Sequence, residues 1–301
     1  MTPPQLIFST EIANALQTQR PIVALESAVI THGLPAPHNL LLAQQLEEEV
    51  RAQGAVPATI GLLQGRIHIG LEKDELIALA NAPKPRKISR RDFGIAVAQQ
   101  LDGGTTVAGT LIAARSAGLR VFATGGIGGV HRGNAFDISA DLPELGRSPL
   151  IVVCAGAKSI LDLPATLEYL ETQGVAVIGY QTDTFPAFYA TSSGLPIDCR
   201  VETPAEAASI ARAQWQLGIH SAVLVVTPPP AEAALPAEVI EAVIAQALQE
   251  AEAQHIHGAA LTPFLLARVS QLSHGDSLQA NLALLRNNTR LAAQIAIALN
   301  N

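Results

Sequence analysis

Short apolar runs alternate with longer amphipathic segments along this chain. The runs are rich in Val and Ile, and several are apolar at every position, which is typical of strands covered on both faces of a sheet. The strands predicted in this way are Ile22–Leu25, Ala58–Leu63 with Arg66–Gly70, Thr105–Ala108, Arg120–Thr124, Leu150–Ala155, Ala176–Tyr180 and Ala222–Val226. Gln64 and Gly65, between two of these runs, indicate a hairpin turn.

Helical patterns fill the gaps between the runs. Asn39–Gln53 carries a broad apolar stripe, and Thr203-Pro204 followed by Glu206 is typical of a helix start. From Pro236 onward the pattern is almost wholly helical. This alternation predicts an α/β fold, a three-layer α/β/α sandwich with a mixed, largely parallel central sheet. No linker or repeat interrupts it, so we expect a single domain over residues 1–301.

The amino-acid composition excludes several classes of protein. Hydrophobic residues make up 49% of the 301 residues and charged residues 15%, which excludes a disordered chain. The net charge of −7 argues against nucleic-acid binding, because no basic patch can neutralise phosphates. No apolar run is long enough to span a membrane, and two cysteines, Cys154 and Cys199, cannot build a disulfide framework or a structural zinc site. No export signal is visible, so a cytoplasmic protein is expected.

Polar residues that follow buried strands are the candidates for chemistry, because ligands bind beyond the carboxyl ends of strands in open α/β sheets. Lys158 follows the run Leu150–Ala155, and burial there would favour a neutral amine able to attack a carbonyl carbon. The alternative is a lysine that ends a strand and extends to solvent. Glu26 also ends a strand. It could be a general acid with a raised pKa, or a carboxylate that caps the next turn.

The segment Thr124–Gly133 holds five glycines, which let backbone N–H groups approach a phosphate closely. Its spacing does not fit a dinucleotide-binding loop, since His131 stands where the third glycine should be. A phosphate monoester or sugar phosphate is therefore expected rather than NAD, and the alternative is a tight loop that binds no ligand. Asp137 and Asp141 lie four residues apart, which suits either a hard divalent ion or the acidic start of a helix.

A basic cluster, Lys87–Asp92, stands out in this acidic chain. Its lysine and two arginines could hold a phosphate. Alternatively, Ser89 could cap a helix with Asp92 three residues later.

Together these motifs resemble the pseudouridine-5′-phosphate glycosidases, a family that includes indigoidine-synthase-A-like proteins. The resemblance runs in order through almost the whole chain, which makes it far more specific than a lone glycine loop. The matching stretches include VALES (23–27), THG (31–33), KISRRD (87–92), GTTVA (104–108), VFATGGIGGVHRG (121–133), FDISADL (136–142), CAGAKSILD (154–162) and GDSL (275–278).

The resemblance implies an enzyme of pseudouridine catabolism that reversibly cleaves the C–C glycosidic bond of pseudouridine 5′-phosphate, giving uracil and ribose 5-phosphate. It also implies a homotrimer with one Mn²⁺ ion per subunit. Lys158 falls at the nucleophile position, Glu26 at the proton donor and Asp137 at the metal ligand. The substrate-contact positions implied by the resemblance are Lys87, Val107, Ser139, Ala140, Asp141, Thr124, His131 and Asn281.

The residues support this implied chemistry. Once the ribose ring opens, a neutral amine can add to C1′, and the resulting iminium draws electrons from the breaking C–C bond. Three departures from the family pattern leave room for a shifted substrate: Ala28 near Glu26, a short link from Gly133 to Phe136, and Thr227 followed by three prolines. The alternatives are a Schiff-base aldolase, a nucleotide hydrolase of a pigment or antibiotic pathway, and a non-catalytic nucleotide-binding regulator.

Overall fold

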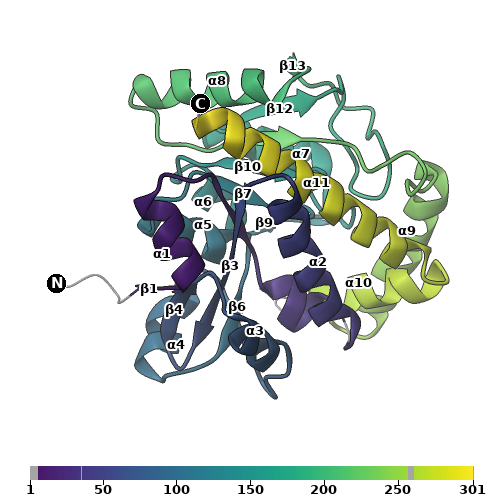
Figure 1. Cartoon of the computed structure of the whole chain (residues 1–301). Coiled ribbons are helices and arrows are strands. Elements are labelled where there is room, and N and C mark those ends of the chain that lie inside the picture. Colours follow the sequence, from purple (N-terminus) through teal and green to yellow (C-terminus); the bar gives the residue numbers. More distant parts are fainter. Residues whose placement is uncertain (1–5, 35, 257–260, 301) are drawn as a thin grey trace.

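A mixed, mostly parallel sheet forms the centre of the computed structural model, which describes residues 6–34, 36–256 and 261–300 (Figure 1). Within these residues the main path of the sheet runs, in spatial order, through β1 (Leu6–Phe8), β4 (Arg66–Ile69), β3 (Val56–Leu63), β2 (Ile22–Leu25), β7 (Val121–Ala123), β10 (Ile151–Cys154), β14 (Val223–Val226), β12 (Ala176–Tyr180) and β13 (Cys199–Val201). Only the pairings of β3 with β4 and with β6 (Gly103–Thr105) are antiparallel, while β5 (Arg86–Ile88) runs parallel to β6. The predicted fold class is confirmed.

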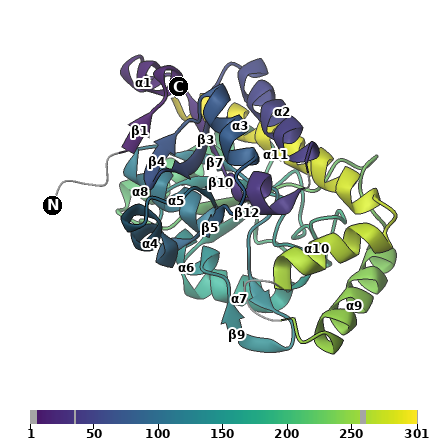
Figure 2. The ribbon, with the colours of Figure 1, turned by 90° about the horizontal axis from the view of Figure 1, so that it is seen from below.

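Helices cover both faces of this sheet, as Figures 1 and 2 show. On one face lie α2 (His38–Ala52), α8 (Pro204–Gln216) and the long α11 (Asp276–Asn300), which crosses β2, β7 and β10. On the other lie α5 (Val107–Ser116), α6 (Asp141–Leu145) and α7 (Leu163–Thr172). Every residue of β2, β10 and β14 is buried, as expected for strands covered on both sides.

The remaining elements lie around this sandwich. They are α1 (Thr10–Gln17), the π-helical turn η1 (Val29–Gly33), α3 (Lys73–Ala80), the 3₁₀ turn η2 (Arg90–Asp92), α4 (Phe93–Ala98), α9 (Ala237–Ala253) and α10 (Leu261–Leu272). A small separate sheet joins β11 (Leu161–Asp162), β8 (Val130–His131) and β9 (Asn134–Ile138). Within the described segments, no helix combines the length and the apolar character needed to cross a membrane.

Local signals place most boundaries where the sequence predicts them. Thr203 caps α8 by accepting a hydrogen bond from the Glu206 N–H, and Gln64-Gly65 forms the β3–β4 turn with positive φ at both residues. The predicted strand Thr105–Ala108 is wrong beyond its first residue. Thr106 caps α5 instead, because its hydroxyl accepts the Gly109 N–H at 3.2 Å and ends the extended run.

The register of the parallel strands brings the candidate catalytic residues to one edge of the sheet. Leu25 is paired with Ala123, and Ala123 with Val153, so three parallel strands end side by side. The residues that follow these strands therefore meet at the same edge. They include Glu26 after β2, Thr124 after β7 and Lys158 a few positions beyond β10.

Candidate active site

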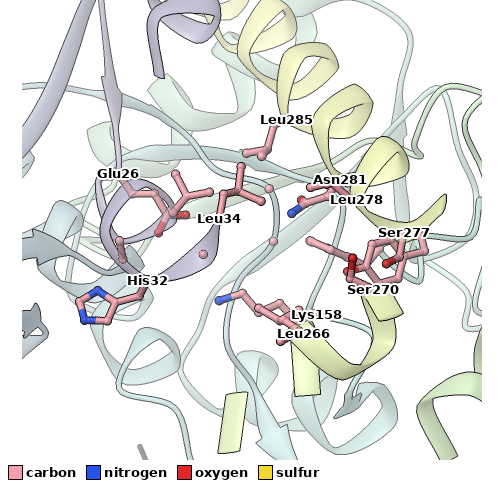
Figure 3. Close-up of a pocket in the computed structure, with 18 of the residues that line it drawn as sticks. Glu26, His32, Leu34, Lys158, Leu266, Ser270, Ser277, Leu278, Asn281 and Leu285 are labelled. Atoms are coloured by element: carbon pink, nitrogen blue, oxygen red, sulfur yellow. The ribbon is translucent and has the colours of Figure 1, made fainter. Parts of the chain in front are cut away.

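A cavity of about 530 Å³ opens at this edge of the sheet. Its polar wall holds Glu26, Lys87, Lys158 and the Gly125-Gly126 backbone, all near the carboxyl ends of strands. Much of the remaining lining is apolar and comes from η1, α10 and α11, with α10 and α11 across the cavity from Glu26 (Figure 3). In Figure 3 the amine of Lys158 and the amide of Asn281 extend into the same space that the Glu26 carboxyl faces.

Glu26 is held by the neighbouring strand. The Thr124 hydroxyl donates a short hydrogen bond to its carboxyl group, and Thr124 itself is buried. Burial raises the pKa of Glu26, while the positive charge of Lys158 and the Thr124 hydrogen bond lower it in part. The raised pKa favours the protonated form, which is the form that a general acid needs.

Lys158 lies in the turn after β10 and is half-buried. Its N–H donates to the Ile127 carbonyl at 3.0 Å, which joins the lysine turn to the glycine segment. Arg132 fixes the residues after it by donating to the carbonyls of Ser159 (2.8 Å) and Leu161 (3.1 Å). In the described part of the chain the ammonium makes no hydrogen bond or ion pair, so it is available to a ligand.

Lys87, on β5, is the second half-buried lysine of the cavity. Its pKa is lowered by burial and by repulsion from Lys158, against the attraction of Asp141 and Glu26. Neither arginine of its cluster, Arg90 or Arg91, lines the cavity, and Arg90 pairs with buried Glu144. Arg86, just before the cluster, pairs with Asp92. The cap of Ser89 and Asp92 is also present. The cluster is therefore a capped turn that presents one lysine to the cavity, rather than a clamp made by all three cations.

Asp141 ties two backbone segments together behind the cavity. One carboxylate oxygen accepts the Ala108 N–H and the other accepts the Gly128 N–H, both at 2.8 Å. The first residue of α5, Val107, keeps an N–H with no hydrogen-bond partner in the described residues, and N–H groups at a helix start are suited to phosphate. Ser139 and Ala140 lie beside it, at the start of α6.

Two predicted residues lie on the β8–β9 hairpin. His131 is paired with Leu161 in the small sheet, and Asp137 lies in β9; neither lines the cavity. The described residues contain no group of three or more His, Cys, Asp or Glu side chains placed to hold a metal ion. Asp137 therefore fits a hard divalent ion that keeps most of its ligands as water, and does not fit an ion enclosed by protein side chains.

Several cavity residues were not predicted from the sequence. His32 follows Glu26 by six positions, and its pKa is lowered by burial and by Lys87. The THG motif at 31–33 was a usable signal for it. Tyr189, whose pKa is raised by burial, and Ser277 close the far side, and no local pattern marks either of them.

Fold and site together define the class: an α/β enzyme with a lysine amine and a carboxyl group facing one cavity. The sequence profile of the indigoidine synthase A-like proteins matches residues 11–298. The chain belongs to this family.

Similar proteins agree with this assignment. A pseudouridine-5′-phosphate glycosidase of Dinoroseobacter shibae is 55% identical over 292 residues, covering 96% of both chains. One from Chloroflexus aurantiacus is 54% identical and covers 98% of this chain and 99% of its own. Among solved structures, prealnumycin C-glycosynthase AlnA in complex with ribulose 5-phosphate superposes with a TM-score of 0.91 at 41% identity, covering 98% of this chain and 97% of AlnA. An indigoidine synthase A-like protein from Thermotoga maritima gives a TM-score of 0.90 at 34% identity, with the same coverage.

Proposed function

We propose that this protein reversibly cleaves the C–C glycosidic bond of pseudouridine 5′-phosphate, giving uracil and ribose 5-phosphate, as a step of pseudouridine catabolism. The observation that carries the proposal is the placement of Lys158 and Glu26 on one cavity, where the charge of Lys158 lowers the pKa of Glu26 in part. Relatives that are more than half identical over nearly the whole chain bear the name of this activity.

The proposed reaction uses the two groups in sequence. Glu26 gives its proton to the ring oxygen as the C1′–O4′ bond breaks, which leaves C1′ electrophilic and conjugated with the uracil ring. The neutral amine of Lys158 adds to C1′. The nitrogen passes its surplus proton to the Glu26 carboxylate, and its freed electron pair forms a C=N bond as the C1′–uracil bond breaks. Glu26 gives the same proton to the uracil carbon. Water hydrolyses the imine and releases ribose 5-phosphate.

The phosphate of the substrate has a suitable site beside this pair. Lys87 supplies a positive charge without a competing ion pair in the described residues, and the Val107 N–H begins a helix beside Ser139 and Ala140. Asn281, on α11, offers a side-chain amide to the base or ribose.

Trapping of the imine tests the mechanism. Protein incubated with ribose 5-phosphate and reduced with borohydride should gain one sugar phosphate, and peptide mass spectrometry should locate it on Lys158. Lys158→Met should lose both the adduct and the release of uracil, whereas Lys87→Met should keep the adduct at a higher ribose 5-phosphate concentration. An adduct on Lys87 instead, or full activity of Lys158→Met, would refute the proposed roles.

A divalent ion, Mn²⁺ in our proposal, would bind through the Asp137 carboxylate with water as its other ligands. Such an ion supplies positive charge near the phosphate end of a bound substrate. Mn²⁺ binding measured by electron paramagnetic resonance should show about one ion per chain and be lost in Asp137→Asn. Equal binding by Asp137→Asn would exclude this site.

We also propose that three chains assemble into a homotrimer that acts in the cytoplasm. The family resemblance supports the trimer, and exposed apolar side chains such as Leu217 (78%) and Val239 (60%) offer surface that another copy could cover. Both cysteines are free thiols, as is usual in a reducing compartment. Light scattering should give a mass three times that of the 31.4 kDa chain.

The apolar wall favours one second candidate, the joining of ribose 5-phosphate to a larger aromatic ring. Leu34, Leu266, Leu278 and Leu285 line the same cavity as Lys158, and AlnA is named as a C-glycosynthase. Incubation with ribose 5-phosphate and either uracil or a hydroxynaphthoquinone separates the two. The proposal of uracil as the natural base predicts that uracil is much the better acceptor.

A further inference from the structure

Asn288 is a buried amide on α11 that the proposed reaction does not use. The side chain is fully buried, and its Nδ2 donates to two successive carbonyls, those of Thr124 (2.8 Å) and Gly125 (3.2 Å). These carbonyls belong to the turn that leaves β7 and forms part of the cavity wall. A residue 163 positions away in sequence therefore holds the backbone of this turn.

Close packing around Gly125 and Gly126 also restricts the position of this turn. A Cβ added to Gly125 would lie 3.1–3.3 Å from Leu284 and Leu285 of α11, and one added to Gly126 would lie 2.6 Å from the Phe188 ring. The turn is thus enclosed between α11 and the Phe188 loop. Backbone bonds tie the turn to β10, since the Thr124 N–H donates to the Val153 carbonyl (3.0 Å) and the Gly125 carbonyl accepts the Ala155 N–H (2.9 Å). Asn288 adds the polar contact that ties the turn to α11, because no other side chain in the described residues donates to the Thr124 and Gly125 carbonyls.

The same turn carries the hydroxyl that bonds to Glu26. Thr124 donates that hydroxyl to the carboxyl group while its own carbonyl accepts from Asn288. The path from Asn288 to the acid is therefore one residue long. We propose that Asn288 is a positioning residue that sets the proton affinity of Glu26 through Thr124, an inference that rests on the function proposed above.

The groups that face Glu26 determine whether loss of Asn288 raises or lowers the pKa of Glu26. These are Lys158, Lys87 and Asp141, besides the Thr124 hydroxyl. Thr124 favours the ionised carboxylate by donating to it, so moving Thr124 away leaves burial less opposed. Loss of Asn288 should therefore raise the pKa of Glu26 further. Leucine is a suitable replacement, since it keeps the branching of the asparagine side chain and replaces its oxygen and NH₂ group with methyl groups.

The chain supplies a matched control in the preceding residue. Asn287 lies about 100° away around α11. It is only partly buried, and its amide reaches the Pro228 carbonyl at 3.5 Å, in a different loop. Asn287→Leu makes the same chemical change without touching the Thr124 turn.

The experiment compares pH profiles of kcat/KM for release of uracil from pseudouridine 5′-phosphate. Asn288→Leu should lower kcat/KM by roughly tenfold to a hundredfold, as expected when a catalytic group is slightly misplaced, and should move the limb assigned to Glu26 to higher pH. Asn287→Leu should keep the wild-type profile. An unchanged limb in Asn288→Leu, whatever its rate, would reduce Asn288 to a structural role and overturn the inference.

A double substitution tests the route and protects against a variant that folds poorly. Thr124→Val removes only the hydroxyl, and it should move the same limb in the same direction. Adding Asn288→Leu to Thr124→Val should move it no further, because both act through one hydrogen bond. A further shift of similar size would show that Asn288 acts by another path.

A second readout does not depend on the reaction. Carbon-13 NMR of protein labelled at the Glu carboxyl, with the Glu26 signal assigned from its loss in Glu26→Gln, gives the same pKa directly. If wild-type protein releases no uracil, the proposed function fails, yet the shift between wild type and Asn288→Leu still decides the inference.

Discussion

Asp141 offers a direct test of how the site is held together. It is only 5% exposed, and its two carboxylate oxygens accept the N–H groups of Ala108 and Gly128, one from α5 and one from the glycine segment. Asp141→Asn keeps the shape of the side chain but replaces one acceptor with an NH₂ group. One of the two backbone N–H groups must then face another donor.

The expected loss in free energy of unfolding follows from these two hydrogen bonds. A hydrogen bond to a charged group contributes about 1.5–3 kcal/mol, and a buried donor left without a partner costs about 1–3 kcal/mol. The neutral amide is easier to bury than the carboxylate, which offsets part of the loss. We expect the free energy of unfolding to fall by about 3 kcal/mol, roughly a hundredfold in the unfolding equilibrium.

Urea denaturation at neutral pH and equal protein concentration measures this loss. Asp137→Asn is the control, since it makes the same change four residues earlier on a half-buried side chain with no carboxylate hydrogen bond in the described residues. It should change the free energy of unfolding by no more than about 0.5 kcal/mol. Equal stability of Asp141→Asn and the wild type, or an equal loss in both variants, would refute the reasoning.

Three further predictions concern Glu26, the cysteines and Arg132. Burial raises the folded-state pKa of Glu26 above 4.5, so its ionisation costs stability as pH rises from about 4.5 through the folded pKa. Glu26→Gln should therefore melt above the wild type at about pH 8 and close to it near pH 4.5; a lower melting temperature at the higher pH would contradict this. Burial raises the pKa of Cys154 to about 12, so iodoacetamide should label half-buried Cys199 and leave Cys154 unmodified in the native protein, as read by mass spectrometry. Labelling of Cys154 at the faster rate would show that the β10 strand is open. Arg132→Lys loses the forked contact to the carbonyls after Lys158 and should lower kcat by roughly tenfold. Glu241→Gln, which removes only the ion pair of Arg132, should lower it less, and the reverse order would assign the effect to that ion pair.

The hydrophobic pattern of the sequence was sufficient to predict the central strands of the sheet, but it did not predict the short strands at its edges. The apolar runs Ile22–Leu25 and Ala176–Tyr180 became strands with the predicted bounds. The first is buried at every residue, as expected for a strand covered on both faces, and the second is partly buried. Short strands such as Arg86–Ile88 and Cys199–Val201 were missed, since charged or polar residues interrupt their apolar pattern. Their pairing is fixed by neighbouring strands rather than by their own composition.

The candidate site likewise contains some residues that the sequence could predict and others that it could not. Glu26, Thr124 and Lys158 could be predicted because they follow adjacent parallel strands, and the register places them together. Tyr189 and Ser277 could not, because they reach the cavity through loop and helix packing that no short segment encodes. Asn288 looks like one of two ordinary helix asparagines until the contact with Thr124 is seen.

The position of α11 in the chain has a consequence for synthesis. The ribosome makes every strand of the sheet, both cavity lysines and Glu26 before it reaches residue 276. A nascent chain can assemble its sheet by then, but it lacks the wall that carries Asn281 and the amide that secures the Thr124 turn. Fragments released early therefore carry Glu26 and both cavity lysines without a finished cavity, and the cavity becomes complete only after α11 has been made.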